Sequence, residues 1–157
     1  MPAASNRYPA AIAEFSAIDP DFESRVRTSF ANQSAMASLG ITIDALGPGW
    51  VDLEFEVPPG FTQQAGFVHA AVVAAALDSA CGYAAYTLAG ADTDVVTSEY
   101  KINLLRPTVG KSFVARGWVV RPGATLTVSQ GELTERDGDV PLAIMTGTIV
   151  HVRRDPA

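Results

Sequence analysis

The chain has 157 residues, of which 48% are hydrophobic and 18% charged. This is enough for one domain with a sizeable core, and it excludes a disordered polymer. The formal net charge of −6 argues against a protein that binds nucleic acids through their phosphates. A single cysteine, Cys81, excludes a disulfide framework and a cysteine-based zinc site. Together with a start that lacks a basic region followed by an apolar run, it predicts a cytoplasmic location.

The N-terminal part of the chain predicts an arm followed by a short helix. Residues 1–18 carry no periodic pattern and are expected to form a loose arm, and residues 19–157 a single domain. Asp19 followed by Pro20 is typical of a helix start, and Gly40 of a helix end. An apolar stripe at a four-residue step supports this short helix: Phe22, Val26 and Phe30.

The rest of the chain predicts strands around one long helix. Residues 41–50 indicate a strand and hairpin, and residues 50–57 alternate between apolar and polar side chains, as in a half-buried strand. An alanine-rich stretch, 70–90, predicts a buried helix rather than a membrane span, because Asp78 lies in its middle. Four strands are expected at 95–105, 112–121, 125–135 and 140–152, and their short connections predict an antiparallel meander. The fold class is therefore α+β, with a curled antiparallel sheet around the long helix.

The helix entry is the segment best suited to chemistry. A glycine-containing loop, 61–69, leads into the helix, whose unpaired amides and dipole suit a developing oxyanion. Asp78 in an apolar helix is costly unless it is paired or used. The plain alternatives are an ordinary loop before a helix, and a carboxylate satisfied by nearby hydroxyls such as those of Ser79 and Thr87.

These residues carry a resemblance to a known family. The pattern Gly66-x-x-His69-Ala70-Ala71, with Asp78 on the helix and then 97–107 ending in Arg-Pro, resembles the hotdog-fold acyl-CoA thioesterases of the phenylacetate (PaaI-like) type. The resemblance covers about residues 39–152 and implies the hotdog fold, in which a curled sheet wraps one central helix. It also implies a homodimer that often pairs again into a tetramer, and a substrate that brings coenzyme A. No other cofactor is expected.

The resemblance also implies a role for each matching residue. Asp78 corresponds to the catalytic carboxylate, which acts as nucleophile or as general base on water. Gln63 takes the place of an Asn that holds the thioester or the water, and the backbone N–H of Ala70 points at the thioester oxygen. Thr97 corresponds to a Ser or Thr that orients the attacking water, and His69 fixes the loop.

Two departures from the family pattern affect this assignment. Ala70-Ala71 replaces Gly-Gly, which keeps the N–H donors but adds methyl groups where the substrate approaches closely. Gln63 is one methylene longer than Asn, so Gln64 could take its role. Gly66, Gln64 and the motif residue His69 are counted with the substrate-binding candidates.

Helix geometry independently predicts that two chains form the site. Ala70 and Asp78 are eight residues apart, which is about 12 Å along a helix. One carbonyl must lie within about 3 Å of both the oxyanion donor and the attacking group. An antiparallel partner can bring its own helix start to Asp78, so a homodimer with interfacial sites is expected.

The phosphates of coenzyme A call for cations along their path. The arginine candidates are Arg106, Arg116, Arg121, Arg153 and Arg154. Arg121 is favoured because it precedes a Pro-Gly turn, and Arg106 is the second choice. Two histidines without clustered ligands predict no metal site.

Two alternative functions remain open from the sequence. A hotdog hydratase or dehydratase would use His69 and Asp78 for proton transfer beside a carbonyl. A non-catalytic acyl-CoA binding protein would explain the replacement of Gly-Gly by Ala70-Ala71.

Overall fold

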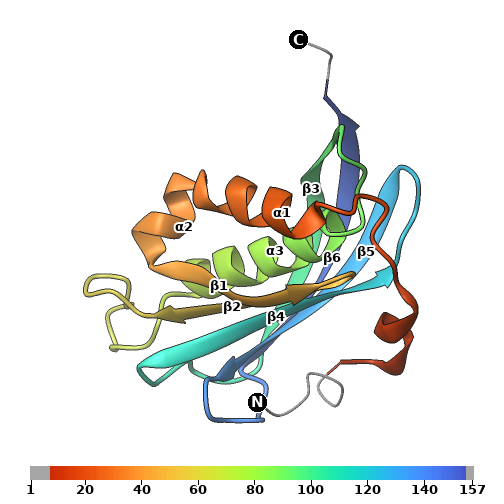
Figure 1. The fold of residues 1–157 in the computed structure, drawn as a ribbon. Coiled ribbons are helices and arrows are strands. Elements are labelled where there is room, and N and C mark those ends of the chain that lie inside the picture. Colours follow the sequence, from red (N-terminus) through yellow and green to blue (C-terminus); the bar gives the residue numbers. More distant parts are fainter. Residues whose placement is uncertain (1–7, 155–157) are drawn as a thin grey trace.

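The computed structural model describes residues 8–154, and in it six antiparallel strands curl around one long helix (Figure 1). The strands are β1 (Ile41–Gly47), β2 (Trp50–Glu56), β3 (Thr93–Leu104), β4 (Ser112–Arg121), β5 (Leu126–Glu135) and β6 (Ala143–Arg153). Their order in the sheet is β1-β2-β4-β5-β6-β3. The central helix is α3 (Ala70–Tyr86), and it contacts all six strands. The predicted α+β architecture is confirmed.

Alternation of apolar and polar side chains places one face of each strand against α3. In β2, Val51, Leu53 and Phe55 are buried, whereas the residues between them are half-exposed. This is the pattern that a two-residue period produces on a sheet with one covered face.

Two glycines let the sheet approach α3 closely. A Cβ atom on Gly117 of β4 would lie 2.2 Å from the carbonyl oxygen of Ala80, and one on Gly131 of β5 would lie 3.0 Å from Cys81 Sγ. A side chain at Gly117 would require the backbone of α3 to move, and one at Gly131 would require its neighbours to give by a few tenths of an ångström. Small residues in α3 and glycines in the sheet therefore fix the position of the helix.

The N-terminal helical region is two helices rather than the single one predicted. α1 (Phe22–Ala31) buries Val26 and Phe30, and α2 (Ser34–Leu39) buries Met36. Gln33 between them has an extended backbone, with φ −81° and ψ 96°. After this break, Met36 of α2 is buried in the core together with Val26 and Phe30 of α1. Figure 1 shows α1 and α2 on the side of α3 that faces away from the sheet.

The predicted loose arm is packed against the sheet over its described part, 8–18. It contains a short 3-10 helix, η2 (Ala10–Glu14), in which Ile12 is only 8% exposed. The ring of Tyr8 lies 5.1 Å from that of Trp50, and the Tyr8 hydroxyl donates a hydrogen bond to Asp52. These contacts cover part of the outer face of the sheet. Residues 1–7, the rest of the predicted arm, lie outside the described residues.

The predicted meander is wrong for its first strand. β3 pairs with β6 and not with β4, so only β4, β5 and β6 are consecutive neighbours. The connection 105–111 does not fold back as a hairpin, because it passes the start of α3, where Val68 N–H donates to the Thr108 carbonyl at 3.0 Å. β3 therefore forms one edge of the sheet, where it also contacts α3.

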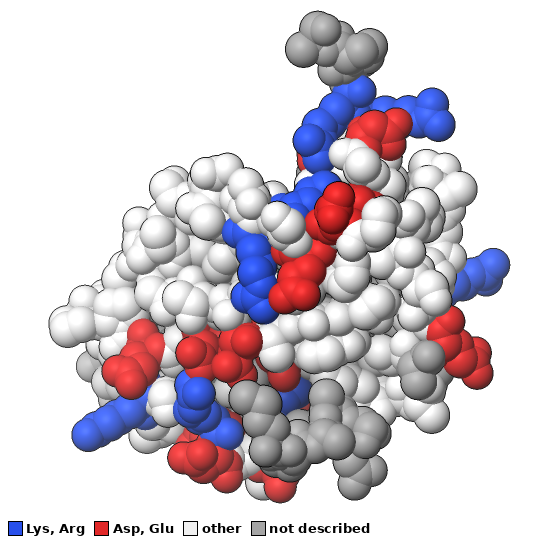
Figure 2. Space-filling view, viewed as in Figure 1, with Lys and Arg blue, Asp and Glu red and all other residues white. Residues whose placement is uncertain are grey.

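The surface is mixed in charge, and no described helix is suited to cross a membrane. Figure 2 shows acidic and basic side chains interspersed on one face of the molecule. Within residues 8–154 no helix is both long and apolar enough to span a bilayer.

Candidate active site

A tight turn shapes the loop that enters α3. Gly66 N–H donates to the Gln63 carbonyl at 2.9 Å, and Gln63 N–H donates to the Phe67 carbonyl at 2.7 Å. Gly66 has a φ of 85°, which glycine adopts without strain. The Gln63 side-chain oxygen accepts from Ala65 N–H at 2.7 Å, so this side chain is held on the turn. Within the described residues nothing accepts from its NH₂ group, which leaves that group able to donate to a ligand. Gln64 is exposed on the same turn.

His69 begins α3 as its N-cap. Its Nδ1 accepts a hydrogen bond from Ala71 N–H at 3.0 Å, so the proton of the neutral ring is on Nε2. Ala70 N–H, the first amide of the helix, has no acceptor within residues 8–154. An unpaired amide at a helix start carries part of the positive end of the helix dipole. The arrangement provides a donor for an oxygen that gains negative charge.

This helix start lines a cavity of about 330 Å³, which we call the donor half-site. Its wall is formed by Gln63, Phe67, Val68, Ala70, Val73 and residues 104–108. Arg106 is the one candidate phosphate ligand in this wall, and its Nη1 donates to the Pro141 carbonyl at 2.9 Å. Arg121 is exposed at the end of β4 and lines neither half of the candidate site.

Asp78 lies two turns further along α3, in a separate cavity of about 640 Å³, which we call the carboxylate half-site. Its Oδ1 atom is buried and has no hydrogen-bond partner. The hydroxyls expected as alternative partners do not satisfy it, since Ser79 donates to Met36 Sδ and Thr87 donates to the Ala84 carbonyl. A buried carboxylate oxygen without a partner is costly, and it is common at functional sites.

Thr97 of β3 lines the same carboxylate half-site as Asp78. The remaining wall residues are Ser29, Gln33, Ser79, Gly82, Tyr83, Tyr86, Asp94, Val95 and Val96. The structure thus brings Asp78 and Thr97 together, and separately brings Gln63, Ala70 and Arg106 together. The two cavities share no residue, so one chain does not place the amide donor and the carboxylate on one carbonyl.

Both half-sites border the edge strand β3. Thr97 belongs to the carboxylate half-site and Leu104 to the donor half-site. Between and beside them, large apolar side chains are exposed: Val96 is 56%, Tyr100 45% and Leu104 50% exposed. The strand also has no neighbour on its outer side within the described residues. An unpaired edge with exposed apolar side chains is suited to pairing with another strand.

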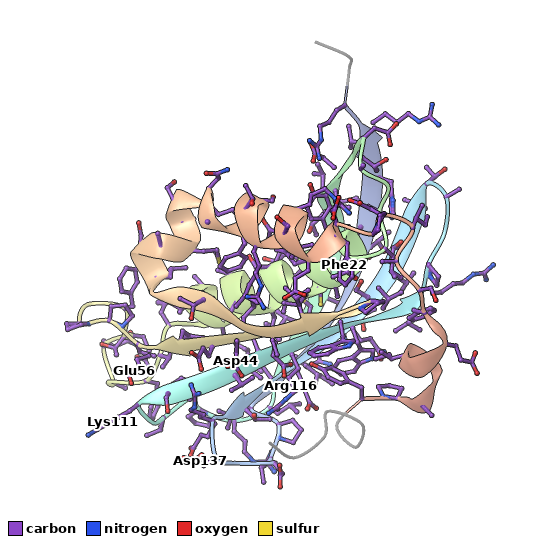
Figure 3. All side chains as sticks on the ribbon, in the orientation of Figure 1. Phe22, Asp44, Glu56, Lys111, Arg116 and Asp137 are labelled. Carbon is purple, nitrogen blue, oxygen red and sulfur yellow. The ribbon has the colours of Figure 1, made fainter. Side chains whose placement is uncertain are left out.

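Cys81 and Arg116 have structural roles and line neither half-site. Cys81 is 1% exposed, and burial, followed by the nearby charge of Asp78, raises the pKa of its thiol; this is the environment of a structural cysteine rather than of a nucleophile. Arg116, a candidate for phosphate binding, is 3% exposed and donates to Thr134 Oγ1 at 2.9 Å. Figure 3 shows Arg116 on the side of β4 that faces away from α3. It also lies 3.7 Å from a carboxylate oxygen of Glu132, so it belongs to a buried charge cluster.

Comparison with known proteins agrees with this architecture. A family model described as the thioesterase superfamily matches residues 65–142. A solved thioesterase family protein from Silicibacter pomeroyi is 45% identical, with a TM-score of 0.81 over 84% of this chain and 98% of that one. The chain belongs to the thioesterase superfamily. Membership supports hydrolysis of thioesters as its general activity, and the predicted resemblance is confirmed.

Two further similarities extend this result. A sequence relative from Saccharolobus solfataricus, provisionally named an esterase, is 34% identical over 100 residues, which are 64% of this chain and 71% of that protein. The PaaI protein of Escherichia coli, from a phenylacetic acid degradation operon, has a TM-score of 0.77 at 19% identity over 84% of this chain and 94% of that one. At this identity the likeness to PaaI shows the shared hotdog fold.

The sequence analysis missed part of the carboxylate half-site. Ser29 of α1 and Gln33 after it line the cavity, as does Gly82 of α3. A signal was present, because Ser29 and Gln33 follow Val26 at three and seven residues and so continue its buried stripe with polar side chains. Polar residues at core-facing positions of a helix indicate a cavity or a buried polar contact.

Proposed function

We propose that this protein hydrolyses acyl-CoA thioesters in the cytoplasm, at two sites formed across a homodimer interface. The observation that carries the proposal is the buried, unpartnered Oδ1 of Asp78 in a cavity separate from the unpaired Ala70 amide. Each half-site lacks what the other supplies. A dimer built on the β3 edge completes both.

The placement of the half-sites along β3 supports this dimer. An antiparallel pairing of two β3 strands about the point between Tyr100 and Lys101, two residues past the middle of the strand, would put the region of Thr97 opposite the region of Leu104 in the partner. The carboxylate half-site of one protomer then meets the donor half-site of the other. Burial of the exposed apolar side chains on this edge favours the association.

In this proposed site, the thioester oxygen accepts hydrogen bonds from Ala70 N–H and the Gln63 NH₂ group of one protomer. Both donors stabilise the negative charge that develops on the oxygen. Asp78 of the other protomer either attacks the carbonyl carbon or takes a proton from a water that attacks it. Thr97 orients the water, the carbon–sulfur bond breaks, and coenzyme A leaves as a thiol. One water is consumed, and one acid is released for each thioester.

Arg106 is proposed to bind the phosphates of coenzyme A, because it lies in the wall of the donor half-site. Arginine is suited to this role by its planar, permanently charged guanidinium group. His69 acts on the loop as the N-cap and not on the substrate.

The test compares two acidic residues of one cavity. Asp78→Asn keeps the shape of the side chain but removes its charge, and should lower kcat by about 10²–10⁴-fold. Asp94→Asn is the matched control, because Asp94 lines the same cavity but accepts from Tyr86 Oη at 3.2 Å and pairs with Arg154. It should keep most of the activity in an assay of thiol release from a panel of acyl-CoA thioesters.

The same panel separates the other activities. Hydration of an enoyl-CoA without thiol release would contradict hydrolysis and support the hydratase reading. Tight binding of acyl-CoA with neither reaction would support a binding protein. Full thiol release by the Asp78→Asn variant would refute the role of this carboxylate.

A further inference from the structure

Gly82 lies in the interior of α3, where a glycine destabilises a helix relative to alanine. Its φ is not positive, so the backbone does not require glycine there. Apart from the backbone of α3 itself, a Cβ atom built on Gly82 would meet no atom of residues 8–154 within 4 Å. This differs from Gly117, where a Cβ would collide with α3 at 2.2 Å. Neither backbone conformation nor packing within one chain accounts for Gly82.

The open space beside Gly82 belongs to the carboxylate half-site. Gly82 and Asp78 both line that cavity, and they are four residues apart on the same face of α3. Four residues correspond to about 6 Å along the helix axis. The absent side chain therefore leaves room one turn from the buried carboxylate oxygen.

The wall of this space is polar but lacks positive charge. Among the described residues that line it there are two carboxylates, of Asp78 and Asp94, and no lysine or arginine. The hydroxyl groups of Ser29 and Tyr83 lie within hydrogen-bond distance of each other, at 3.1 Å. The Asp94 carboxylate already pairs with Arg154, which is not among the residues of this wall, so an anionic acyl group would meet the unpartnered Asp78 carboxylate without an unpaired cation to bind it.

We propose that Gly82 is the residue that sets which acyl groups this enzyme accepts, and that it admits uncharged acyl groups with a branch or ring within a few bonds of the thioester carbonyl. This inference rests on the proposed function, since it takes the carboxylate half-site as the acyl pocket. The acyl group extends from Asp78 along α3, and its widest part occupies the space that a side chain at position 82 would fill. Glycine is kept at a cost in helix stability because that space is needed.

The experiment measures kcat/KM for three thioesters: acetyl-CoA, cyclohexanecarbonyl-CoA and succinyl-CoA. The wild-type protein should prefer the cyclohexanecarbonyl ester and use the anionic succinyl ester poorly. Gly82→Ala should lower kcat/KM for the ring substrate by about tenfold, and Gly82→Leu by more, because a misfitting methylene costs about 10–200-fold. For acetyl-CoA the change should stay within about threefold, since that acyl group ends before Gly82.

Stability and a matched variant separate this effect from misfolding. Gly82→Ala should unfold at the same temperature or about 2–4 °C higher, because alanine favours the helix. Ala31→Leu adds a larger side chain to an exposed position of α1 outside this cavity and should leave the substrate ratios unchanged. If Gly82→Leu does not fold, the alanine variant alone decides.

Three results would overturn the inference. Equal losses for the ring and acetyl substrates, or no loss for either, would show that Gly82 does not select the acyl group. Efficient cleavage of succinyl-CoA would contradict the uncharged acyl class. A wild-type protein that cleaves no acyl-CoA would overturn the proposed function as well, whereas the other two outcomes leave it intact.

Discussion

Replacing Ala70 by proline removes the proposed oxyanion donor and should leave the shape of the helix unchanged. Ala70 is the first residue of α3, and proline is well tolerated at that position because its missing N–H has no partner within the helix. His69 has φ −63° and ψ 136°, which is the conformation preferred before proline. Ala70→Pro should therefore change the free energy of unfolding by less than about 0.5 kcal/mol.

The expected effect on catalysis is much larger. Loss of one donor to a developing oxyanion typically lowers kcat by about 10²–10³-fold. Ala70→Gly is the matched control, because glycine keeps the N–H and removes only the methyl group. It should retain or exceed the wild-type rate if the methyl group crowds the substrate.

Mixing two inactive variants tests the shared site directly. Ala70→Pro lacks the proposed donor and Asp78→Asn lacks the carboxylate, so in the proposed dimer each variant alone has two damaged sites. After random exchange of subunits, half of the dimers are mixed, and each mixed dimer has one intact site. Thiol release should recover to about one quarter of the wild-type rate.

The mixing experiment can also refute the proposal that two chains form each site. No recovery after subunit exchange, verified by native mass spectrometry, would mean that donor and carboxylate do not come from different chains. Unchanged kcat in Ala70→Pro would mean that the Ala70 amide does not bind the thioester oxygen.

Three further predictions concern the fold. Gly117→Ala should destabilise the protein by about 1–3 kcal/mol in urea unfolding, because the added Cβ would lie 2.2 Å from the Ala80 carbonyl oxygen; Gly138→Ala, with its nearest neighbour at 3.4 Å, is the control that should show little change. Cys81 is buried, and burial raises the pKa of its thiol. The native protein should therefore not react with a thiol reagent, whereas the protein unfolded in urea should react at this one thiol. Fast labelling of the native protein would contradict the packing of α3 on the sheet. The hydrogen bond from Arg25, and next that from Asp21 N–H, lower the pKa of Asp19, so its contribution is present above the unfolded-state pKa and is lost as the pH falls through the lower folded-state value. Asp19→Asn should therefore be less stable than wild type at pH 6, and the difference should shrink at pH 3; a constant difference would contradict this linkage.

Much of the local structure follows from sequence patterns alone. The alternation in β2 predicted its buried residues, and the alanine-rich stretch predicted α3 from its first residue, Ala70. These patterns are local, since side-chain period and helix propensity act within a few residues. The break at Gln33 was not predicted, because it depends on Met36 reaching a core formed by distant segments.

The candidate site was predicted only in part, for a similar reason. Family resemblance pointed to Asp78, Gln63 and Ala70, and helix geometry separated the carboxylate from the donor. The contribution of α1 to the carboxylate half-site, through Ser29, came from the structure. Ser29 lies about 50 residues before Asp78 in the sequence, and no local pattern indicated that the two would border the same cavity.

The sequence by itself determined that one buried helix carries an acid in an apolar surrounding and begins at a loop suited to bind an oxyanion. It did so because composition, period and helix-start chemistry are properties of neighbouring residues. Only the tertiary structure decided that β3 forms the sheet edge, that the two half-sites lie in separate cavities beside it, and that Gly82 faces open space. Each of these three features depends on which distant segments pack together. Connections of similar length between strands allow more than one strand order, so the sequence pattern does not decide it.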